Sequence, residues 1–430
     1  MSEQARQLRV SALARVEGEG ALDVVVRENA VERAELRIYE PPRFFEAFLR
    51  GRAYTEPPDI TARICGICPV AYQTSACRAL ENACGVRLPE PIANLRRLIY
   101  CGEWISSHAL HIYLLHAPDF LGYPDAITLA ADAHAEVERG LRLKKVGNQI
   151  LELIGGRAIH PINMKVGGFY RTPAPEELEP LRETLHQALD DALATVEWVS
   201  TFHYPDLTLD HRFLTLSEPD QYAIEGGQPR TDKGVLFPVE SFPEHVVEYQ
   251  VERSTAMHAT LDGGRYITGP LARYSINSAT LTPTAKRAAK AAGLGTECRN
   301  PFRSIIVRAV EVVYAIEEAL RLIDGYRQPE LPAVEVRPRD AVGHGASEAP
   351  RGLLYHRYEI GADGLIRSAD IVPPTAQNQT AIEEDLRRLV EHNLELDDQK
   401  LTALCEQSIR NYDPCISCST HFLTLRRITR

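Results

Sequence analysis

Two pairs of cysteines, one near each end of the chain, are the residues best suited to chemistry in this sequence. The first pair is Cys65 and Cys68, and the second is Cys415 and Cys418. Two residues separate the thiols of each pair, a spacing that lets both sulfurs bind one metal ion. Because nearly the whole chain lies between the pairs, the fold must bring its ends together. We therefore expect one buried metal site with four thiolate ligands.

The other cysteines are better explained as buried small hydrophobic residues, which is how free cysteine usually behaves. Nine cysteines among 430 residues are too few for a secreted domain built on disulfides, and their number is odd. Five of them stand alone: Cys77, Cys84, Cys101, Cys298 and Cys405. For the two pairs, the ligands by themselves favour a structural zinc ion.

The residues around the two pairs argue against structural zinc. Zinc ribbons and knuckles usually take their ligands from short segments, whereas these pairs lie almost a full chain length apart. Asp413 lies two residues before Cys415, and His421 lies three residues after Cys418. Polar groups of this kind tune and orient a metal site, which a purely structural ion does not require.

The composition is that of an ordinary globular protein. Its hydrophobic content of 44% and charged content of 25% are average, and its length suggests two or three packing units. A net charge of −11 argues against a surface that binds nucleic acid or anionic membranes. The apolar runs are far too short to cross a membrane, and the first residues do not resemble an export signal. We therefore expect a cytoplasmic location.

Apolar residues at three- and four-residue intervals predict long helices, and β-branched or alternating runs predict small sheets between them. The expected helices are 44–49, 71–84, 91–115, 131–154, 175–200, 283–292, 301–322, 381–396 and 401–411. The expected β segments are 21–26, 31–38, 207–278 and 333–371.

The predicted fold class is α+β and mainly α, with a central bundle of long helices and small peripheral sheets. We expect one compact unit. Its parts are 1–60 (β-rich), 61–202 (first part of the bundle), 203–280 (irregular β), 281–330 (second part of the bundle), 331–375 (β) and 376–430 (C-terminal helices and metal motif).

Several motifs together resemble the large, catalytic subunit of nickel–iron hydrogenases. Both cysteine motifs are present in order: Arg-Ile-Cys-Gly-Ile-Cys-Pro at 63–69 and Asp-Pro-Cys-Ile-Ser-Cys-Ser-Thr-His at 413–421. Arg-Val-Glu-Gly at 15–18 is similar to the family's N-terminal element. Further segments resemble family loops, at 155–161 and 167–169, and family active-site strands, at 349–352 and 372–375.

The resemblance implies a nickel ion held by all four paired cysteines: Cys65, Cys68, Cys415 and Cys418. Cys68 and Cys418 would also bridge to an iron ion that carries carbon monoxide and cyanide. Thiolates are soft ligands that tolerate changes in the oxidation state of nickel. The implied reaction is the reversible, heterolytic cleavage of H2 into protons and electrons.

The resemblance also assigns roles to residues around the metals. Glu17 would be the first acceptor of the proton inside the protein. Arg351, with Pro350 beside it, would lie over the open coordination position, and Asp119 and Asp413 would hold its guanidinium. Without the resemblance, these acids would be interpreted as surface or helix-terminating residues.

A second metal position is implied near the C-terminal motif. Glu46 and His421 would hold a magnesium ion, and Thr375 would donate a hydrogen bond to an iron-bound cyanide. One residue departs from the common pattern, since Tyr72 stands where many family members have a histidine. A phenol donates one hydrogen bond but cannot act as an imidazole at neutral pH.

The chain requires partners if the resemblance holds. It has no further grouped cysteines for iron–sulfur clusters and no Gly-x-Gly-x-x-Gly motif after a strand for a dinucleotide. The implied partners are an iron–sulfur small subunit and flavin-containing diaphorase subunits that use NAD(P). The segments 69–73 and 300–305 resemble the cytosolic NAD(P)-linked or sulfhydrogenase branch. The tail Phe422–Arg430 is either a precursor segment that is cleaved or a permanent terminus.

Three alternatives remain open at this stage. The first is a hydrogen sensor with the same ligands and slow turnover. The second is a structural subunit of a respiratory complex, although such relatives lack the metal-binding cysteines. The third is a scaffold stapled by zinc, with no enzymatic activity.

Overall fold

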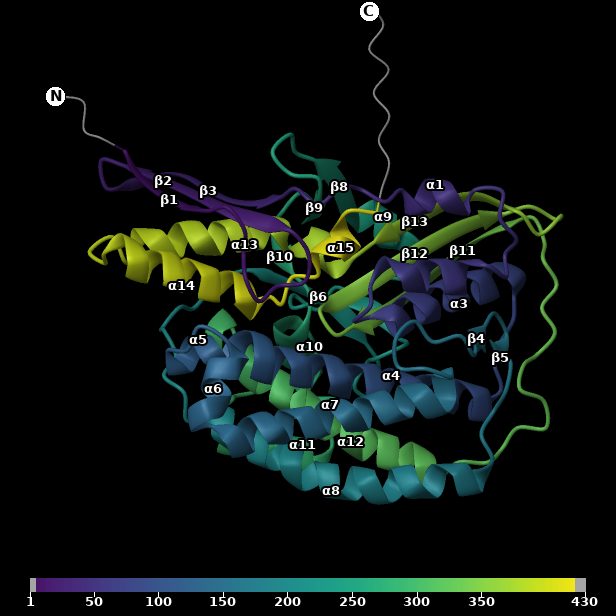
Figure 1. Ribbon diagram of the computed structural model, residues 1–430. Helices are drawn as coiled ribbons and strands as arrows, with labels where there is room; N and C mark the ends of the chain where they lie inside the picture. The colour runs from purple at the N-terminus through teal and green to yellow at the C-terminus, as the bar shows by residue number, and fades with distance from the viewer. Residues whose placement is uncertain (1–4, 422–430) are drawn as a thin grey trace, which may run out of the picture.

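The computed structural model describes residues 5–421, and its largest feature is the predicted bundle of long helices. Four helices pack together in the lower half of Figure 1: α4 (Glu90–Leu110), α7 (His134–Gly155), α8 (Pro175–Ser200) and α12 (Ser304–Asp324). Nearly every residue of α12 is buried, because apolar side chains cover several of its faces. The predicted class, α+β with a central bundle, is confirmed.

The predicted helix 91–115 is divided in the structure. After α4, a π-helical turn at His111–His116 leads into α5 (Ala117–Leu121), which has Pro118 in its first turn. Proline lacks the N–H that a helix interior requires, but it fits the first turn, where that group has no helical partner. Pro118 therefore lies in the first turn of α5 and does not end the run of helical residues, which continues to Leu121.

An antiparallel sheet above the bundle carries the helix that follows the first cysteine pair. Its strands are paired in sequence order: β11 (Ala341–Ala349), β12 (Gly352–Ile360) and β13 (Ile366–Val372). α3 (Pro69–Cys84) lies on this sheet (Figure 1). Gly343 permits the contact, since a Cβ there would lie 2.0 Å from the carbonyl oxygen of Ala79. This close packing fixes the helix that begins directly after Cys68.

The N-terminal sheet packs against the last two long helices. Its antiparallel strands also follow sequence order: β1 (Arg6–Val10), β2 (Gly20–Arg27) and β3 (Ala30–Ile38). Leu22 meets Ile382 of α13 (Pro374–Glu391) and Ile409 of α14 (Asp398–Asn411) in a second core. The predicted hairpin is confirmed, whereas β1 was not predicted.

The region 203–280 contains the expected small sheets and also two α-helices, of which α10 (Pro270–Asn277) is the longer. Its strands are β6 (Arg212–Ser217), β7 (Gln228–Thr231), β8 (Val246–Gln250), β9 (Met257–Leu261) and β10 (Tyr266–Ile267). The helix α10 was wrongly assigned to irregular β structure. The segment 372–375 is likewise not a strand throughout, because α13 begins at Pro374. In both cases a proline occupies the first turn of a helix.

The remaining elements are short. They are α1 (Phe45–Leu49), α2 (Pro57–Thr61), α6 (Ala126–Asp132), α9 (Phe242–His245), α11 (Pro283–Ala291), α15 (Ile416–Ser419), β4 (Met164–Lys165) and β5 (Gly168–Phe169). Among residues 5–421, none of the helices combines the length and the apolar character needed to cross a membrane. The tail Phe422–Arg430 lies outside the described residues.

Candidate metal centre

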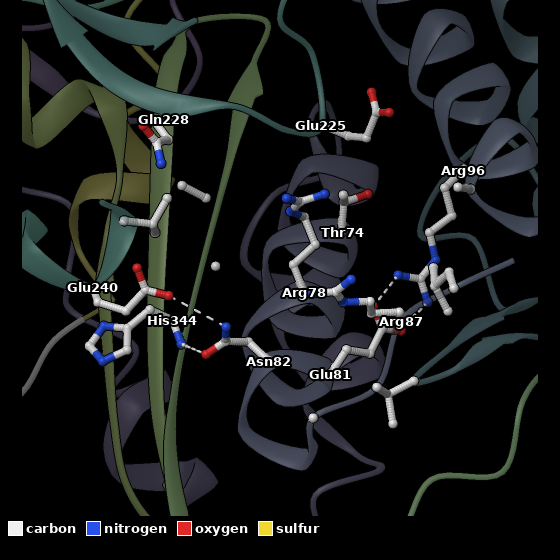
Figure 2. A pocket seen from close by; sticks show the side chains of 17 residues that line it. Thr74, Arg78, Glu81, Asn82, Arg87, Arg96, Glu225, Gln228, Glu240 and His344 are labelled. Carbon is white, nitrogen blue, oxygen red and sulfur yellow. Dashed lines mark hydrogen bonds and ion pairs between the residues drawn. The ribbon is translucent and has the colours of Figure 1, made fainter. Parts of the chain in front are cut away.

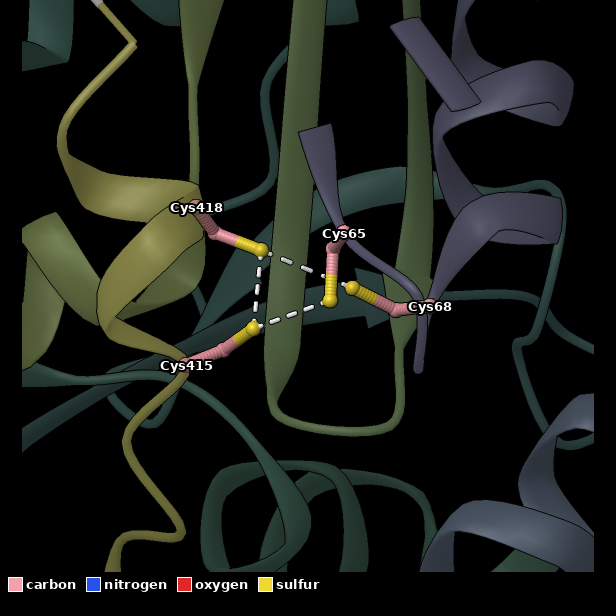
Figure 3. A group of neighbouring side chains, drawn as sticks. All are labelled: Cys65, Cys68, Cys415 and Cys418. Carbon is pink, nitrogen blue, oxygen red and sulfur yellow. Dashed lines mark hydrogen bonds between the residues drawn. The ribbon is translucent and has the colours of Figure 1, made fainter. Parts of the chain in front are cut away.

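The four paired cysteines meet at one buried point (Figure 3). Their sulfur atoms all lie within 4.8 Å of one another. The sulfur of Cys415 is 3.2 Å from that of Cys65 and 2.9 Å from that of Cys418. The sulfurs of Cys68 and Cys418 are 3.6 Å apart. The fold thus brings the two ends of the chain together, as the sequence required.

The arrangement fits a bound metal ion. Metal–sulfur bonds of about 2.3 Å place tetrahedral sulfurs about 3.8 Å apart, which falls within the range of 2.9 to 4.8 Å that these sulfurs cover. The hydrogen bond with Cys415, and those with the other two sulfurs, lower the pKa of Cys65. Burial raises the pKa of Cys415 and of Cys418. Four buried thiols this close cannot all ionise without a cation, and a soft or borderline metal ion supplies that charge.

The first pair is held at the start of α3. Cys68 is the residue immediately before this helix, whose first backbone N–H groups have no helical partner. Glu103 of α4 accepts hydrogen bonds from two of these groups, the N–H of Val70 at 2.6 Å and the N–H of Ala71 at 3.0 Å. Burial raises the pKa of Glu103 well above its usual range. We did not select Glu103 from the sequence, because nothing near it indicates that it faces the end of another helix.

The second pair is tied to the first by Arg43. Its guanidinium donates hydrogen bonds to the carbonyl oxygen of Ile64 at 2.6 Å and to that of Ser417 at 2.7 Å. One side chain therefore joins the residue before Cys65 to the helix that carries Cys418. We did not predict this role, since its only signal in the sequence is a basic residue close to the proposed ligand Glu46.

Glu17 faces the sulfur of Cys415. Its Oε2 lies 3.2 Å from that sulfur and accepts a hydrogen bond from the backbone N–H of Ser417 at 3.1 Å. The backbones of Glu17 and Cys415 also form a parallel β-bridge, which fixes the position of the carboxyl group. Burial, followed by the nearby Cys65, raises the pKa of Glu17. The structure thus places a carboxyl group beside a ligand sulfur, where it can exchange a proton.

Arg351 is buried in the turn between β11 and β12. Its Nε donates to the carbonyl oxygen of Asp413 at 2.7 Å, and a terminal nitrogen donates to Asp413 Oδ1 at 2.9 Å. Burial opposes the charge, but Asp413 and the nearby cysteine sulfurs outweigh it and hold the pKa of Arg351 well above its usual range. The guanidinium is therefore a fixed cation beside the thiols, paired with Asp413 as expected.

The turn that carries Arg351 rests on a second buried arginine. Arg273 of α10 donates to the carbonyl oxygens of Ala349 at 2.7 Å and Pro350 at 2.9 Å. It also pairs with Glu311 at 2.9 Å and with Glu348 at 3.1 Å, and all three of these side chains are fully buried. Pro350 is thus fixed through its carbonyl group. The sequence analysis did not select Arg273, since its partners come from distant helices and strands.

Asp119 does not hold Arg351, contrary to the expectation. Its Oδ1 accepts hydrogen bonds from Arg15 at 2.5 Å and from Arg410 at 2.8 Å. Among the described residues no hydrogen bond joins Asp119 to Arg351. The reason is that the Asp119 carboxylate is engaged by two other arginines, while Asp413 already satisfies Arg351.

Thr375 lies in the first turn of α13, close to the second cysteine pair. Its Oγ1 accepts a hydrogen bond from the backbone N–H of Cys415 at 2.9 Å. A hydroxyl group that accepts one hydrogen bond keeps its own proton to donate. A hydrogen bond from Thr375 to an iron-bound ligand therefore stays a prediction.

Glu46 and His421 come together beside the C-terminal motif. Glu46 Oε1 is 3.8 Å from His421 Nε2 and accepts a hydrogen bond from the N–H of Ile371 at 2.7 Å. The same His421 nitrogen is 3.0 Å from the carbonyl oxygen of Ile371. Burial raises the pKa of Glu46 to about 7. A carboxylate, a carbonyl and an imidazole in one place suit a divalent cation.

Tyr72, the residue that departs from the common pattern, is fully buried in the first turn of α3. Its hydroxyl has no hydrogen-bond partner among the described residues, and its ring centre lies 5.6 Å from that of His356. Burial, followed by the sulfurs of Cys418 and Cys68, raises the pKa of Tyr72 well above its usual range. Tyr72 is therefore a neutral phenol near the thiol site, with one proton to donate.

The candidate centre is separate from a surface groove of about 690 Å³ that is lined by residues of α3, α4, β7 and β11 (Figure 2). Arg96 and Glu81 form a buried ion pair in its wall, with a distance of 2.6 Å. None of the four paired cysteines, and neither Glu17 nor Arg351, lines this groove. The metal centre is enclosed instead, which suits a very small substrate.

Comparison with known proteins assigns a family. The family model described as nickel-dependent hydrogenase matches residues 43–140 and 248–421, which include both cysteine pairs. The alpha subunit of sulfhydrogenase 1 from Pyrococcus furiosus is 35% identical over 422 residues, and the match covers 97% of this chain and 98% of that protein.

Two further similar proteins are named as NAD-reducing enzymes. The beta subunit of the NAD-reducing hydrogenase HoxS from Cupriavidus necator is 28% identical, over 97% of this chain and 95% of that subunit. The crystal structure of an NAD+-reducing [NiFe]-hydrogenase in the H2-reduced state matches with a TM-score of 0.88 and 28% identity, over 97% of this chain and 99% of that one. The chain therefore belongs to the nickel-dependent hydrogenase family, and its buried four-cysteine site is the candidate for a metal centre.

Proposed function

We propose that this chain cleaves H2 reversibly at a nickel–iron centre and passes the electrons, through partner subunits, to NAD(P) or to sulfur. The observation that carries this proposal is the meeting of four buried thiols with a carboxyl group, Glu17, and a fixed cation, Arg351. Membership of the hydrogenase family supports the reaction. The names of the similar proteins, sulfhydrogenase and NAD-reducing hydrogenase, support the two kinds of electron acceptor.

The four paired cysteines would hold nickel. Cys68 and Cys418 would also hold an iron ion that carries carbon monoxide and cyanide. When bound, this centre supplies a Lewis acid for H2 and a store for its electrons. Pro350 and Thr375 are the residues that we expect next to the iron ligands. Thr375 is supported by its contact with Cys415 and by its free hydroxyl proton.

Glu17 acts as the proton acceptor, and Arg351 acts as a fixed positive charge. Glu17 accepts the proton that leaves the thiol site, because its carboxyl oxygen is 3.2 Å from the sulfur of Cys415. Arg351 is held rigidly by Asp413 and directs its positive charge to the space beside the thiols. A fixed charge stabilises the separation of H2 into unlike charges without having to reorganise.

Glu46, His421 and the carbonyl oxygen of Ile371 would hold a magnesium ion. Mg²⁺ prefers oxygen ligands and keeps several waters, so a site with few protein ligands suits it. This ion would tie the residue three positions after Cys418 to strand β13. Its role would therefore be to hold the C-terminal motif in place.

Partner subunits would carry the electrons away. Within residues 5–421, the four paired cysteines are the single cluster of three or more side chains suited to a metal. We propose an iron–sulfur small subunit and flavin-containing diaphorase subunits in the cytoplasm, where NAD(P) is available. Ile159, Ile162 and Tyr170 are exposed on one segment, and Ile159 lies next to Gly66 of the first cysteine motif. An exposed apolar surface this close to the centre supports docking there.

Infrared spectroscopy of the purified complex tests the metal centre. Metal-bound carbon monoxide and cyanide give bands that a zinc site cannot give. We expect these bands together with H2-dependent reduction of NAD(P) or sulfur. A zinc-containing protein without the bands, and without hydrogen turnover, would refute the proposal.

The Glu17→Gln variant tests the proton acceptor. The amide keeps the shape and the contact with Ser417 but cannot take a proton, so we expect the infrared bands to remain and turnover to fall by about 100-fold or more. Glu19→Gln is the matched control, since Glu19 is exposed on the same loop. Near-normal turnover in a metal-replete Glu17→Gln enzyme contradicts the role.

A further inference from the structure

A set of buried polar groups away from Glu17 lacks hydrogen-bond partners. It lies between α12, α14 and the π-helical turn, and seven buried side-chain atoms in it have no partner among the described residues. These atoms are Arg308 Nε, Asn411 Nδ2 and Oδ1, His111 Nδ1, His116 Nδ1 and Nε2, and Asp119 Oδ2. Buried polar groups in folded proteins are almost always satisfied, either by protein or by internal water.

The inner part of this set surrounds a space of the size of one water molecule. A cavity of about 10 Å³ is lined by Arg308, Asn411, Tyr412 and neighbouring residues from β10, α10, α12 and α13. Arg308 also donates to the carbonyl oxygen of Asn411 at 3.1 Å. Asp413, the partner of Arg351, follows two residues after Asn411 and has an unpaired oxygen of its own. This end therefore reaches the metal centre.

The middle of the set consists of two histidines whose rings are in contact and tilted by 49°. The rings of His111 and His116 have centres 4.9 Å apart, and His111 Nε2 contacts the carbonyl oxygen of Arg410 at 2.8 Å. Both lie in the π-helical turn, and turns of this kind often occur at functional sites. Burial lowers the pKa of both histidines well below the usual range. Each ring is therefore neutral, with one nitrogen that donates and one that accepts.

The outer end of the set is at the surface. Arg410 pairs with Asp119, which also pairs with Arg15, and the side chains of Asp119 and Arg15 are 9% and 14% exposed. Unpaired polar groups thus continue from the partner of Arg351 to a point that solvent reaches.

We propose that internal water molecules connect Arg308 and Asn411, through His111 and His116, to Asp119, and that this line is a second, slower route for protons between the metal centre and solvent. The transport role rests on the proposed function, whereas the hydration does not. The route is separate from Glu17. The carboxyl group of Glu17 faces the sulfur of Cys415 and shares no hydrogen bond with these groups among the described residues.

Proton transfer along the line needs no additional reactant. The neutral imidazole of His116, whose two nitrogens both lack a partner among the described residues, takes a proton on its unprotonated nitrogen and releases one from the other nitrogen to the next water. His111 binds water only through Nδ1, because its Nε2 donates to the carbonyl oxygen of Arg410. The ring ends neutral, with its two nitrogens exchanged, and one proton has moved outward. Because the Arg308 cation lies beside the line, the extra proton passes through and is not stored there.

Two substitutions at His116 separate hydration from transport. His116→Phe keeps a ring and removes both nitrogens, and His116→Gln still hydrogen-bonds to water but cannot relay a proton. His258→Phe is the matched control, since His258 is also a buried histidine without hydrogen bonds but lies on β9, outside the line. If His116→Phe fails to fold, His116→Gln decides.

The first measurement is a structure of the assembled complex at a resolution that shows ordered water. We expect water between Asn411 and His116. A region filled by protein side chains, with no ordered water, overturns the proposal whatever the activity of the enzyme.

The second measurement uses the Glu17→Gln background, in which the main route is blocked. We expect His116→Gln to lower the residual turnover by about tenfold and to increase its solvent isotope effect, with unchanged infrared bands. His258→Phe should change neither. The route is refuted if His116→Gln changes neither the residual turnover nor the isotope effect. It is also refuted if the Glu17→Gln enzyme has no residual turnover. If the wild-type complex lacks carbon monoxide and cyanide bands, the proposed function fails, and the water structure alone still decides the hydration.

Discussion

Replacing Arg273 with methionine should destabilise the whole turn that carries Arg351. The substitution removes the single cation shared by Glu311 and Glu348, two fully buried carboxylates. It also removes the donors to the carbonyl oxygens of Ala349 and Pro350. Breaking a buried ion pair from one side usually costs about 3–5 kcal/mol, because the remaining charge stays buried without its counterion.

The expected cost can be converted into a melting temperature. An unfolding entropy of about 2.1 cal/mol/K per residue gives about 0.9 kcal/mol/K for a chain of this length. A loss of about 4 kcal/mol therefore lowers Tm by about 4 °C. Differential scanning fluorimetry of the purified complex measures this shift, and infrared spectroscopy of the same samples shows whether the displaced turn disturbs the iron ligands.

The loss in Tm should also depend on pH. Burial favours the protonated form of Glu311, but Arg273 outweighs burial and holds the Glu311 pKa below its ordinary 4.5. In the wild type this carboxylate therefore adds stability above that pKa. Without Arg273 the folded-state pKa rises above 4.5, so the carboxylate costs stability at pH 7 and less as the pH falls and it takes up a proton.

The loss in Tm should therefore be smaller at pH 5 than at pH 7. Arg337→Met is the matched control, because Arg337 makes an exposed ion pair with Glu335 and should leave Tm unchanged. A drop of less than about 1 °C for Arg273→Met, or an equal drop at both pH values, would refute the reasoning.

Two further predictions concern side chains around the thiols. Arg43→Met loses the hydrogen bonds to Ile64 and Ser417 that join the two cysteine segments, so metal analysis of the purified complex should show less nickel, whereas exposed Arg52→Met should not. A normal nickel content would contradict the proposal that Arg43 joins the two cysteine segments. Tyr72→Phe should leave the fold intact but shift the infrared bands, because the phenol is a buried donor without a partner among the described residues and lies near the Cys418 sulfur. Bands at unchanged positions would show that the hydroxyl does not bond to the metal ligands.

The sequence by itself determined the chemistry at the centre. The two cysteine pairs required a fold that joins the chain ends, and their neighbours Glu17 and Asp413 lie beside the thiols as the motifs predicted. The long helices were also predictable, because an apolar pattern that repeats every three to four residues is a local property. Errors arose mainly at prolines such as Pro270 and Pro374, since the same residue ends one helix and begins another.

The tertiary structure alone decided which side chains support the centre. Arg43, Glu103 and Arg273 act through hydrogen bonds to segments far away in the chain, and Asp119 pairs with Arg15 and Arg410 in place of Arg351. No local pattern marks such a partner, because an arginine or glutamate has the same appearance in a sequence whether it is solvated or buried against a distant backbone. A buried charge is satisfied by whatever group the packing of helices and sheets brings to it, and that packing is a property of the whole chain.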